Sequence, residues 1–251
     1  MHTRENNEEH SQGVTLMTGG SVRRQIVRFA LPVFWGNLFQ QLYNIVDSLV
    51  VGNFLGSDAL AAVGSSGHII FLLVGLFSGL FTGASVVISG YFGAQEHQKM
   101  HTAIHTTVAF GLLAGVVLSV VGVAVSPTLL RWIGTPDSVF ANSALYFRIY
   151  FSGVVFVTLY NTATGILQAV GDSRHPLYYL IISSVTNVVL DLLFVAVFHM
   201  GVDGAALATV ISQAVSAVLG FIRLIRSDAI YRVEPKKVRL NGPMLAKVLH
   251  M

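Results

Sequence analysis

Six long apolar stretches recur along this 251-residue sequence, and they constrain its fold more than any other feature. A helix rises about 1.5 Å per residue, so roughly 20 residues cross a hydrocarbon core about 30 Å thick. Each stretch reaches or exceeds that length. The pattern predicts an all-α integral membrane protein, a bundle of six transmembrane helices at residues 27–55, 67–92, 103–125, 144–170, 177–198 and 204–225.

The composition agrees with a chain whose main solvent is lipid. Hydrophobic residues make up 53% of the sequence and charged residues only 11%, whereas soluble domains carry about 25% charge. The absence of cysteine excludes disulfides and thiol catalysis. No phosphate-binding glycine loop, nucleophile elbow or Cys/His pair is present, so we expect neither an enzyme nor an ATP-driven pump, and no cofactor beyond a transported ion.

The distribution of basic residues predicts the orientation. All of the 15 Lys and Arg residues except Arg131 and Arg148 fall on one side of the six predicted spans. Under the positive-inside rule this side is cytoplasmic, and two cytoplasmic termini require an even number of spans. Basic residues beside a membrane helix fix topology or meet anionic lipid, so we expect membrane lipid and not nucleic acid as their partner.

The chain divides into three parts. Residues 1–26 are polar and lack the apolar core of a signal peptide, so we expect a cytoplasmic tail followed by a first span that itself directs insertion. Residues 27–226 form the six-helix lobe, and residues 227–251 form a cytoplasmic linker.

Small residues and one proline mark sites of helix packing. Gly75, Gly79 and Gly83 recur every four residues in the second span, and Gly111 and Gly115 do so in the third; each set predicts a smooth face that another helix can approach. Pro32 removes a backbone hydrogen bond in the first span, so we expect a bend there, as a fixed kink or as a moving hinge.

Two acidic residues, Asp47 and Asp191, lie within the predicted spans. A carboxylate at membrane depth is unfavourable unless it is protonated, paired or hydrated, so such residues usually mark an ion pathway. A permanently protonated acid that only bonds a neighbouring helix is the plain alternative. Asp47, nearer a helix end, would also reach water readily.

Polar side chains accompany these acids on four helices. At about 100° per residue, they share one face of each span. We expect these faces to surround a polar interior, although hydrogen bonds between helices are the preferred explanation for isolated serines. The aligned residues are Asn37, Gln40, Gln41, Asn44, Asp47 and Ser48; Thr158, Asn161, Gly165 and Gln168; Ser183, Ser184, Asn187 and Asp191; and Thr209, Ser212, Gln213 and Ser216.

Carboxylate, amide and hydroxyl oxygens suit a hard cation such as Na⁺, and the same acids can carry a proton instead. Asn187 and Asp191 are four residues apart and therefore share a helix face. His97, His101 and His105 have the same spacing, but no acidic ligand or HExxH pattern accompanies them, so we expect a solvated interfacial face.

Four motifs, in order, resemble the multidrug and toxic compound extrusion (MATE) transporters of bacterial inner membranes. They are LPVFWGNLFQQLYNIVDSLVVGNFLGSDALAAVG, NTATGILQAVGDSRHP, TNVVLDLLF and GVDGAALATVISQ. The resemblance implies one lobe of a twelve-helix antiporter that exports organic cations or other amphipathic, drug-like toxins against Na⁺ or H⁺. It also implies a multi-pass protein of the bacterial cytoplasmic membrane.

The resemblance implies roles for individual residues. The coupling cation would bind at Asp47, Asn187, Asp191 and Thr209, with Asn161 nearby and Pro32 as the hinge of the first helix. The substrate cavity would be lined by six polar residues of the aligned faces: Asn37, Gln40, Gln41, Asn44, Gln168 and Gln213.

The family has two lobes, and this sequence resembles the first, followed by a linker and the start of a seventh helix. We therefore expect a truncated or half-length transporter that pairs with a second lobe or with a second copy of itself. Two alternatives remain open: a flippase for lipid-linked precursors, which would need a basic groove where only Arg148 is available, and a membrane remnant that does not transport.

Overall fold

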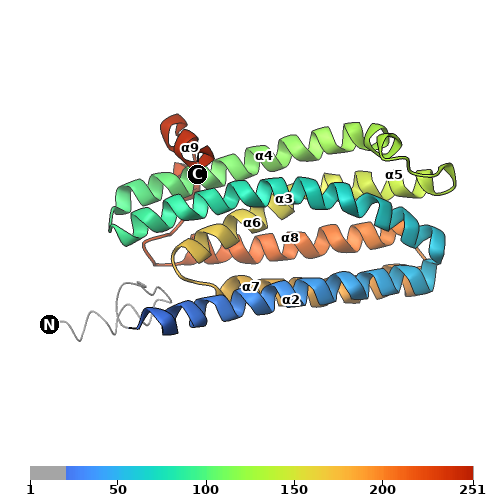
Figure 1. The fold of residues 1–251 in the computed structure, drawn as a ribbon, viewed down its shortest axis with the longest axis horizontal. Helices are drawn as coiled ribbons and strands as arrows, with labels where there is room; N and C mark the ends of the chain where they lie inside the picture. Colours follow the sequence, from blue (N-terminus) through green and yellow to red (C-terminus); the bar gives the residue numbers. More distant parts are fainter. Residues whose placement is uncertain (1–20, 251) are drawn as a thin grey trace.

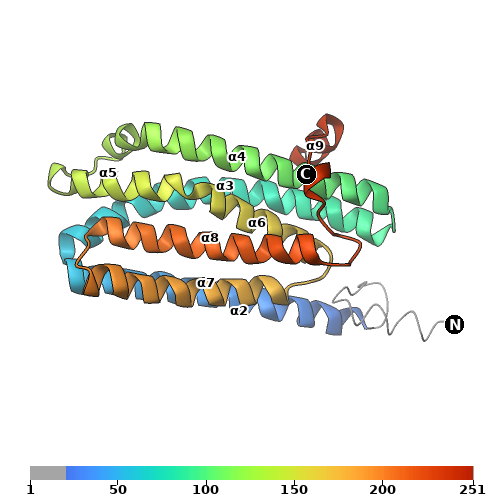
Figure 2. The same cartoon turned by 180° about the vertical axis from the view of Figure 1, so that it is seen from behind.

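The computed structural model describes residues 21–250, apart from a set of side chains at position 22 and between positions 65 and 80. Most of the predicted N-terminal tail therefore lies outside the described residues. Long helices run side by side in one elongated bundle (Figures 1 and 2). The helices of the bundle are α2 (Val22–Leu55), α3 (Ser57–Gly93), α4 (His97–Trp132), α5 (Asp137–Ser152), α6 (Val154–Ala169), α7 (Arg174–Asp191), η1 (Leu192–Val197) and α8 (Val202–Arg226).

Each of the six predicted apolar stretches lies on one of these helices or on a consecutive pair. Three satisfy the length and hydropathy of a membrane span by themselves: α4, α7 joined with η1, and α8; α5 and α6 together make a fourth. The polar stripe of α2 lowers its mean hydropathy, and α3 contains the side chains that are not described. The all-helical membrane lobe predicted from the sequence is confirmed.

Two of the predicted spans are not the continuous α-helices that the sequence indicated. The fourth is broken at Gly153, where α5 and α6 meet at 45°. A Cβ at Gly153 would lie 2.5 Å from the side chain of Val210 in α8, so the break is a close approach of two helices. Ser119 of α4 accepts a hydrogen bond from the freed N–H of Val155 across 3.2 Å. The fifth span changes from α-helix to the wider π-helix η1 directly after Asp191.

One end of the bundle collects nearly all of the positive charge. The start of α2, the α3–α4 turn at residues 94–96, the α6–α7 turn at residues 171–173 and the end of α8 all lie there (Figure 1). We call it the basic end, because every described Lys and Arg except Arg131 and Arg148 lies on these segments, within three residues of them, or on the chain after α8.

The glycines of α4 form the predicted contact face, whereas Gly75 and Gly79 of α3 do not. In α4, a Cβ at Gly115 would lie 2.9 Å from Cα of Val155, and one at Gly111 would collide with the hydroxyl of Thr162. In α3, Gly75 and Gly79 are exposed, and a Cβ at either would meet no described atom within 4 Å. The spacing of small residues predicts a smooth face but not which neighbour covers it.

This difference predicts opposite effects of the same substitution. Gly115→Ala is expected to lower the free energy of unfolding by about 1–3 kcal/mol, because the added methyl group overpacks the α4–α6 contact. Gly79→Ala is the matched control and should leave stability unchanged or raise it by up to about 1 kcal/mol, through helix propensity. Thermal unfolding of the detergent-solubilised chain measures both. Equal destabilisation by the two variants would contradict this account of the packing.

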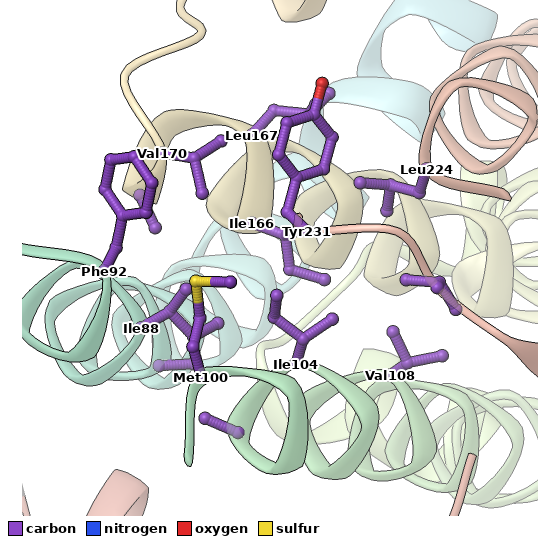
Figure 3. Close-up of a cluster of buried hydrophobic side chains, with 14 of the residues drawn as sticks. Ile88, Phe92, Met100, Ile104, Val108, Ile166, Leu167, Val170, Leu224 and Tyr231 are labelled. Atoms are coloured by element: carbon purple, nitrogen blue, oxygen red, sulfur yellow. The ribbon is translucent and has the colours of Figure 1, made fainter. Parts of the chain in front are cut away.

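The chain after α8 folds back onto the basic end instead of leading away from it. Ala229, Tyr231 and Val233 are buried in the largest apolar cluster of the lobe, beside Ile104 of α4 and Leu224 of α8. Figure 3 shows the ring of Tyr231 among these side chains. The following helix, α9 (Gly242–Leu249), adds Val248 to the same cluster.

A histidine fixes this segment in place. His105 is 5% exposed, and its Nε2 accepts a hydrogen bond from the backbone N–H of Glu234 across 3.1 Å. Its Nδ1 must then carry the ring hydrogen, which it donates to the carbonyl of His101 across 2.7 Å. The predicted solvated histidine face is therefore wrong for His105, because both of its ring nitrogens bond protein groups.

The buried tyrosine of this segment yields a paired test. Tyr231→Ala should lower the free energy of unfolding by about 3–5 kcal/mol, as expected when a large buried ring is removed. Tyr231→Phe should change it by less than about 1 kcal/mol, because the buried hydroxyl has no hydrogen-bond partner among the described residues. Limited proteolysis between residues 227 and 241 provides a second measurement, with faster cleavage expected in the alanine variant only.

Candidate functional site

Three helices bring the two membrane aspartates together. Helix α2 carries Asp47 and packs along α7, where a Cβ at Gly36 would lie 3.7 Å from Leu180 and 3.8 Å from Leu177. Helix α7 ends at Asp191, which is 0% exposed. The carboxyl groups of these two residues lie close enough to share a hydrogen bond. Residues 144 positions apart in the sequence thus form one buried pair.

Asn187 and Thr209 hold one side of this pair. Asn187 lies one turn before Asp191 on α7 and is fully buried. In the amide orientation that satisfies both of its polar atoms, it donates to Oδ2 of Asp191 across 2.8 Å and accepts from the backbone N–H of Thr209 across 3.3 Å. The hydroxyl of Thr209 bonds the carbonyl of Ala205 in its own helix, α8, across 3.1 Å.

The pair also retains unused acceptor atoms. Oδ1 of Asp47 and Oδ1 of Asp191 are both buried, and neither has a hydrogen-bond partner among the described residues. Two carboxyl groups in contact cannot both be ionised without strong repulsion, so this arrangement needs a proton or another cation between them. The donor set, two carboxyl groups with a hydroxyl beside them, consists of the hard oxygen atoms that Na⁺ accepts.

Two tyrosines lie beside the carboxyl pair and a third stacks on one of them; none of the three was predicted from the sequence. Tyr43 lies one turn before Asp47, beside the side chain of Thr209. Tyr146 and Tyr150 of α5 stack with ring centroids 6.4 Å apart. Tyr146 also lies within electrostatic range of both aspartates. The i, i+4 spacing of Tyr43 and Asp47 was the available signal, because it places a phenol on the acidic face of the helix.

The other predicted residues of α2 divide between two surroundings. Gln40 is half-buried on the side that packs against the bundle, as is Asp47. Asn37, Gln41 and Asn44 are exposed, so the expected polar interior does not enclose them in this lobe. The polar stripe is wider than the packed face, and its outer flank bonds within α2, where Asn44 donates to Gln41 across 3.3 Å.

Among the described residues, none of the remaining predicted side chains forms a hydrogen bond with the carboxyl pair. Asn161 is half-buried and donates to the carbonyl of Val157 in its own helix across 2.9 Å. Gln168 and Gln213 are also half-buried. Helix α2 continues through Pro32 without a break, so a hinge there stays a prediction. Ser183 bonds the carbonyl of Ser212 across 2.7 Å, an instance of the helix-to-helix bond considered for isolated serines.

Among the described residues, no group of three or more His, Asp, Glu or Cys side chains has the geometry of a metal site. The rings of His101 and His105 stack, with centroids 5.9 Å apart, and His105 is occupied by the linker. The first observation covers only His, Asp, Glu and Cys, whereas the expected Na⁺ ligands also include Asn187 and Thr209. It therefore does not test the Na⁺ site.

The Thr209 hydroxyl is expected to contribute to stability through its neighbour on α2. Thr209→Val should lower the free energy of unfolding by about 1–3 kcal/mol, because it replaces the buried hydroxyl beside Tyr43 with a methyl group. Thr186→Val is the matched control, since that hydroxyl bonds only Ile182 of its own helix, and a change within about 0.5 kcal/mol is expected. Thermal unfolding in detergent measures both; equal shifts would argue against the polar cluster.

The fold and the site define a helical membrane lobe with a buried carboxyl pair, and comparison with known proteins identifies its family. The MatE family model matches residues 32–193, and the chain belongs to this family. The probable multidrug resistance protein YpnP of Bacillus subtilis is 33% identical over 209 residues, which are 83% of this chain and 47% of that protein. YoeA of the same organism, also a probable multidrug resistance protein, is 38% identical over 196 residues, 76% of this chain and 42% of that protein.

Solved structures give the same result. The crystal structure of a MATE protein in the bent conformation superimposes with a TM-score of 0.87 at 27% identity, over 95% of this chain and 53% of that one. The chain thus spans about half the length of the relatives that it matches. The predicted family and its correspondence with one half of a transporter are confirmed.

Proposed function

We propose that this lobe is the cation-coupling half of a secondary active multidrug efflux transporter, one that exchanges organic cations or other amphipathic toxins for Na⁺ or H⁺. The single observation that carries the proposal is the buried pair of Asp47 and Asp191, which needs a cation to be stable. The relatives named above are transporters, which agrees with a role in transport and not in catalysis.

The pair supports exchange because its protonated and deprotonated states are stabilised by different cations. With a proton between them, the carboxyl groups of Asp47 and Asp191 share a hydrogen bond and hold α2 against α7. Loss of that proton leaves two adjacent negative charges, which either separate or accept Na⁺. Oδ1 of each aspartate is available to such an ion, and the hydroxyl of Thr209 lies beside them.

Helix α2 is the element that this exchange would move. It carries Asp47 near one end and Pro32 a few turns away, where the backbone lacks one hydrogen bond. A change of charge at Asp47 alters the attraction between α2 and α7, and Pro32 is the point at which α2 bends most easily. We propose that this bend changes the affinity for the transported substrate.

The substrate would lie against the exposed polar flank of α2. Asn37, Gln41 and Asn44 are exposed in this lobe, which agrees with a surface completed by a second lobe or by a second copy of the chain. Gln40, Gln168 and Gln213 are half-buried and would contribute from within the lobe, with Asn161 near the coupling site. Amide side chains beside apolar walls suit amphipathic molecules.

We further propose that the lobe lies in the cytoplasmic membrane of a bacterium, with its basic end and both termini in the cytoplasm. The support is the placement of nearly all Lys and Arg at that end, where the positive-inside rule puts the cytoplasm. Arg131, near the opposite end of α4, is one of the two exceptions.

Substitution of both acids tests this proposal. In vesicles that contain the chain, ethidium efflux driven by a Na⁺ or pH gradient should fall at least tenfold in Asp47→Asn/Asp191→Asn, because neither amide can release a proton or bind the ion as an anion. Asp58→Asn/Asp137→Asn is the matched control, which removes two exposed acids from helix first turns and should retain efflux.

A second measurement does not depend on transport. In weakly buffered detergent solution, Na⁺ should release protons from the unaltered chain and from the control variant but not from Asp47→Asn/Asp191→Asn. If neither efflux nor proton release distinguishes the two double variants, the aspartates are structural and the coupling proposal is wrong. That result is the one expected for a membrane remnant that does not transport.

A further inference from the structure

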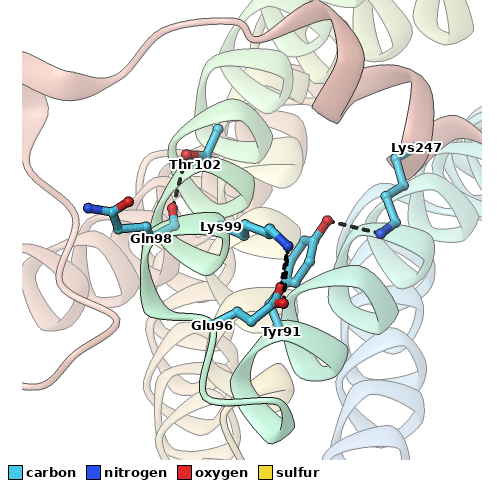
Figure 4. Close-up of polar contacts among 6 residues, drawn as sticks. All are labelled: Tyr91, Glu96, Gln98, Lys99, Thr102 and Lys247. Atoms are coloured by element: carbon cyan, nitrogen blue, oxygen red, sulfur yellow. Dashed lines mark hydrogen bonds and ion pairs between the residues drawn. The ribbon is translucent and has the colours of Figure 1, made fainter.

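Helix α9 closes one side of a cavity at the basic end that the transport proposal does not use. It lies against the ends of α3 and α4, outside the helix bundle (Figures 1 and 4). The cavity has a volume of about 380 Å³, within the range of about 300–1,000 Å³ that small-molecule sites occupy. Its polar lining comprises Tyr91, Gln98, Lys99, Thr102, Asn241 and Lys247.

Two ammonium groups converge on one aromatic ring in this cavity. Nζ of Lys247 donates to the hydroxyl of Tyr91 across 2.9 Å and lies 4.6 Å from the ring centroid. Nζ of Lys99 lies 5.9 Å from the same centroid. Figure 4 shows the tyrosine between the two lysines. The ring holds both positive charges near the cavity and keeps the lysine chains from extending freely into solvent.

The charge of this cluster is only partly balanced. Lys99 pairs with Glu96, with Nζ 2.9 Å from Oε2. Within the described part of the chain, no acidic side chain forms an ion pair with Lys247. The side-chain oxygen of Asn241 accepts from the backbone N–H of Met244 across 3.0 Å, which leaves its NH₂ group as a further donor. The cavity therefore presents net positive charge and hydrogen-bond donors, which suit an anion.

The neighbouring apolar side chains indicate the kind of anion. Leu240 directly precedes Asn241 and is 46% exposed, and Leu249, two positions after Lys247, is 47% exposed. Both belong to the segment that closes the cavity. Exposed leucines beside lysines at the end of membrane helices favour a partner that has a charged head and an apolar body over a small hydrophilic ion.

We propose that the cavity between α9 and the ends of α3 and α4 binds the phosphate of an acidic phospholipid head group, with Lys247 and Lys99 as its cationic contacts. Lys247 supplies the unpaired charge, and Lys99 contributes while it retains Glu96. The leucines lie beside the acyl chains. The choice of lipid over free phosphate rests on the proposed membrane orientation, in which the basic end meets the anionic cytoplasmic leaflet.

Native mass spectrometry of the detergent-solubilised chain with phosphatidylglycerol tests this site. A lysine in contact with an anionic lipid head group contributes roughly fivefold in affinity, so Lys247→Gln should weaken binding about fivefold and Lys99→Gln/Lys247→Gln about twenty-five-fold. Lys247→Arg should stay within about twofold, because it keeps the charge. Lys236→Gln is the matched control: it removes an exposed lysine of η2 (Pro235–Lys237), outside the cavity, and should also stay within about twofold.

Several results would overturn the proposal. These are an equal loss in Lys236→Gln, no loss in Lys99→Gln/Lys247→Gln, equal binding of phosphatidylcholine, or displacement of phosphatidylglycerol by inorganic phosphate, which would identify the free ion as the ligand. Asp47→Asn/Asp191→Asn should bind phosphatidylglycerol as the unaltered chain does. That measurement separates failure of this site from failure of the coupling mechanism, and an unchanged unfolding temperature in the lysine variants shows that they fold.

Discussion

The contact between Asp47 and Asp191 is the interaction on which the arrangement of this lobe depends. Two carboxyl groups inside a membrane bundle are unfavourable unless their charge is limited and their oxygens are bonded. The three helices at this contact satisfy both conditions. Asn187 of α7 donates to Asp191, and Thr209 of α8 lies beside Asn187 and Tyr43. The change from α-helix to π-helix follows Asp191 immediately. Short π-helical segments of this kind are frequent at functional sites.

The sequence predicted the helices and much of this cluster for definite physical reasons. Runs of apolar residues locate membrane helices, and the i, i+4 spacing of Asn187 and Asp191 puts both on one face. Other features left no comparable trace. Gly153 did not predict the break between α5 and α6, because glycine is ordinary in membrane helices. The periodicity of α2 identified its polar face but not which flank its neighbours cover, so the exposure of Asn44 was not predictable from one chain.

The segment after α8 combines many basic residues with buried apolar ones. Ala229, Tyr231 and Val233 are buried, while Ile230 and Arg232 between them are exposed. This alternation is the period-two pattern of an extended segment with one buried face, and it was present in the sequence. Charge and burial are compatible here because successive side chains point in opposite directions. The same arrangement places α9 beside α3 and α4, where its lysine meets Tyr91.

The buried position of Tyr231 and Val248 also determines the order of events during synthesis. The apolar cluster at the basic end contains side chains from α3, α4, α6 and α8, but these last two residues complete it. A ribosome will have delivered all the membrane helices before that cluster can close. The nascent lobe therefore reaches the membrane with an open core at one end, and it becomes fully packed only when nearly the whole described chain has emerged.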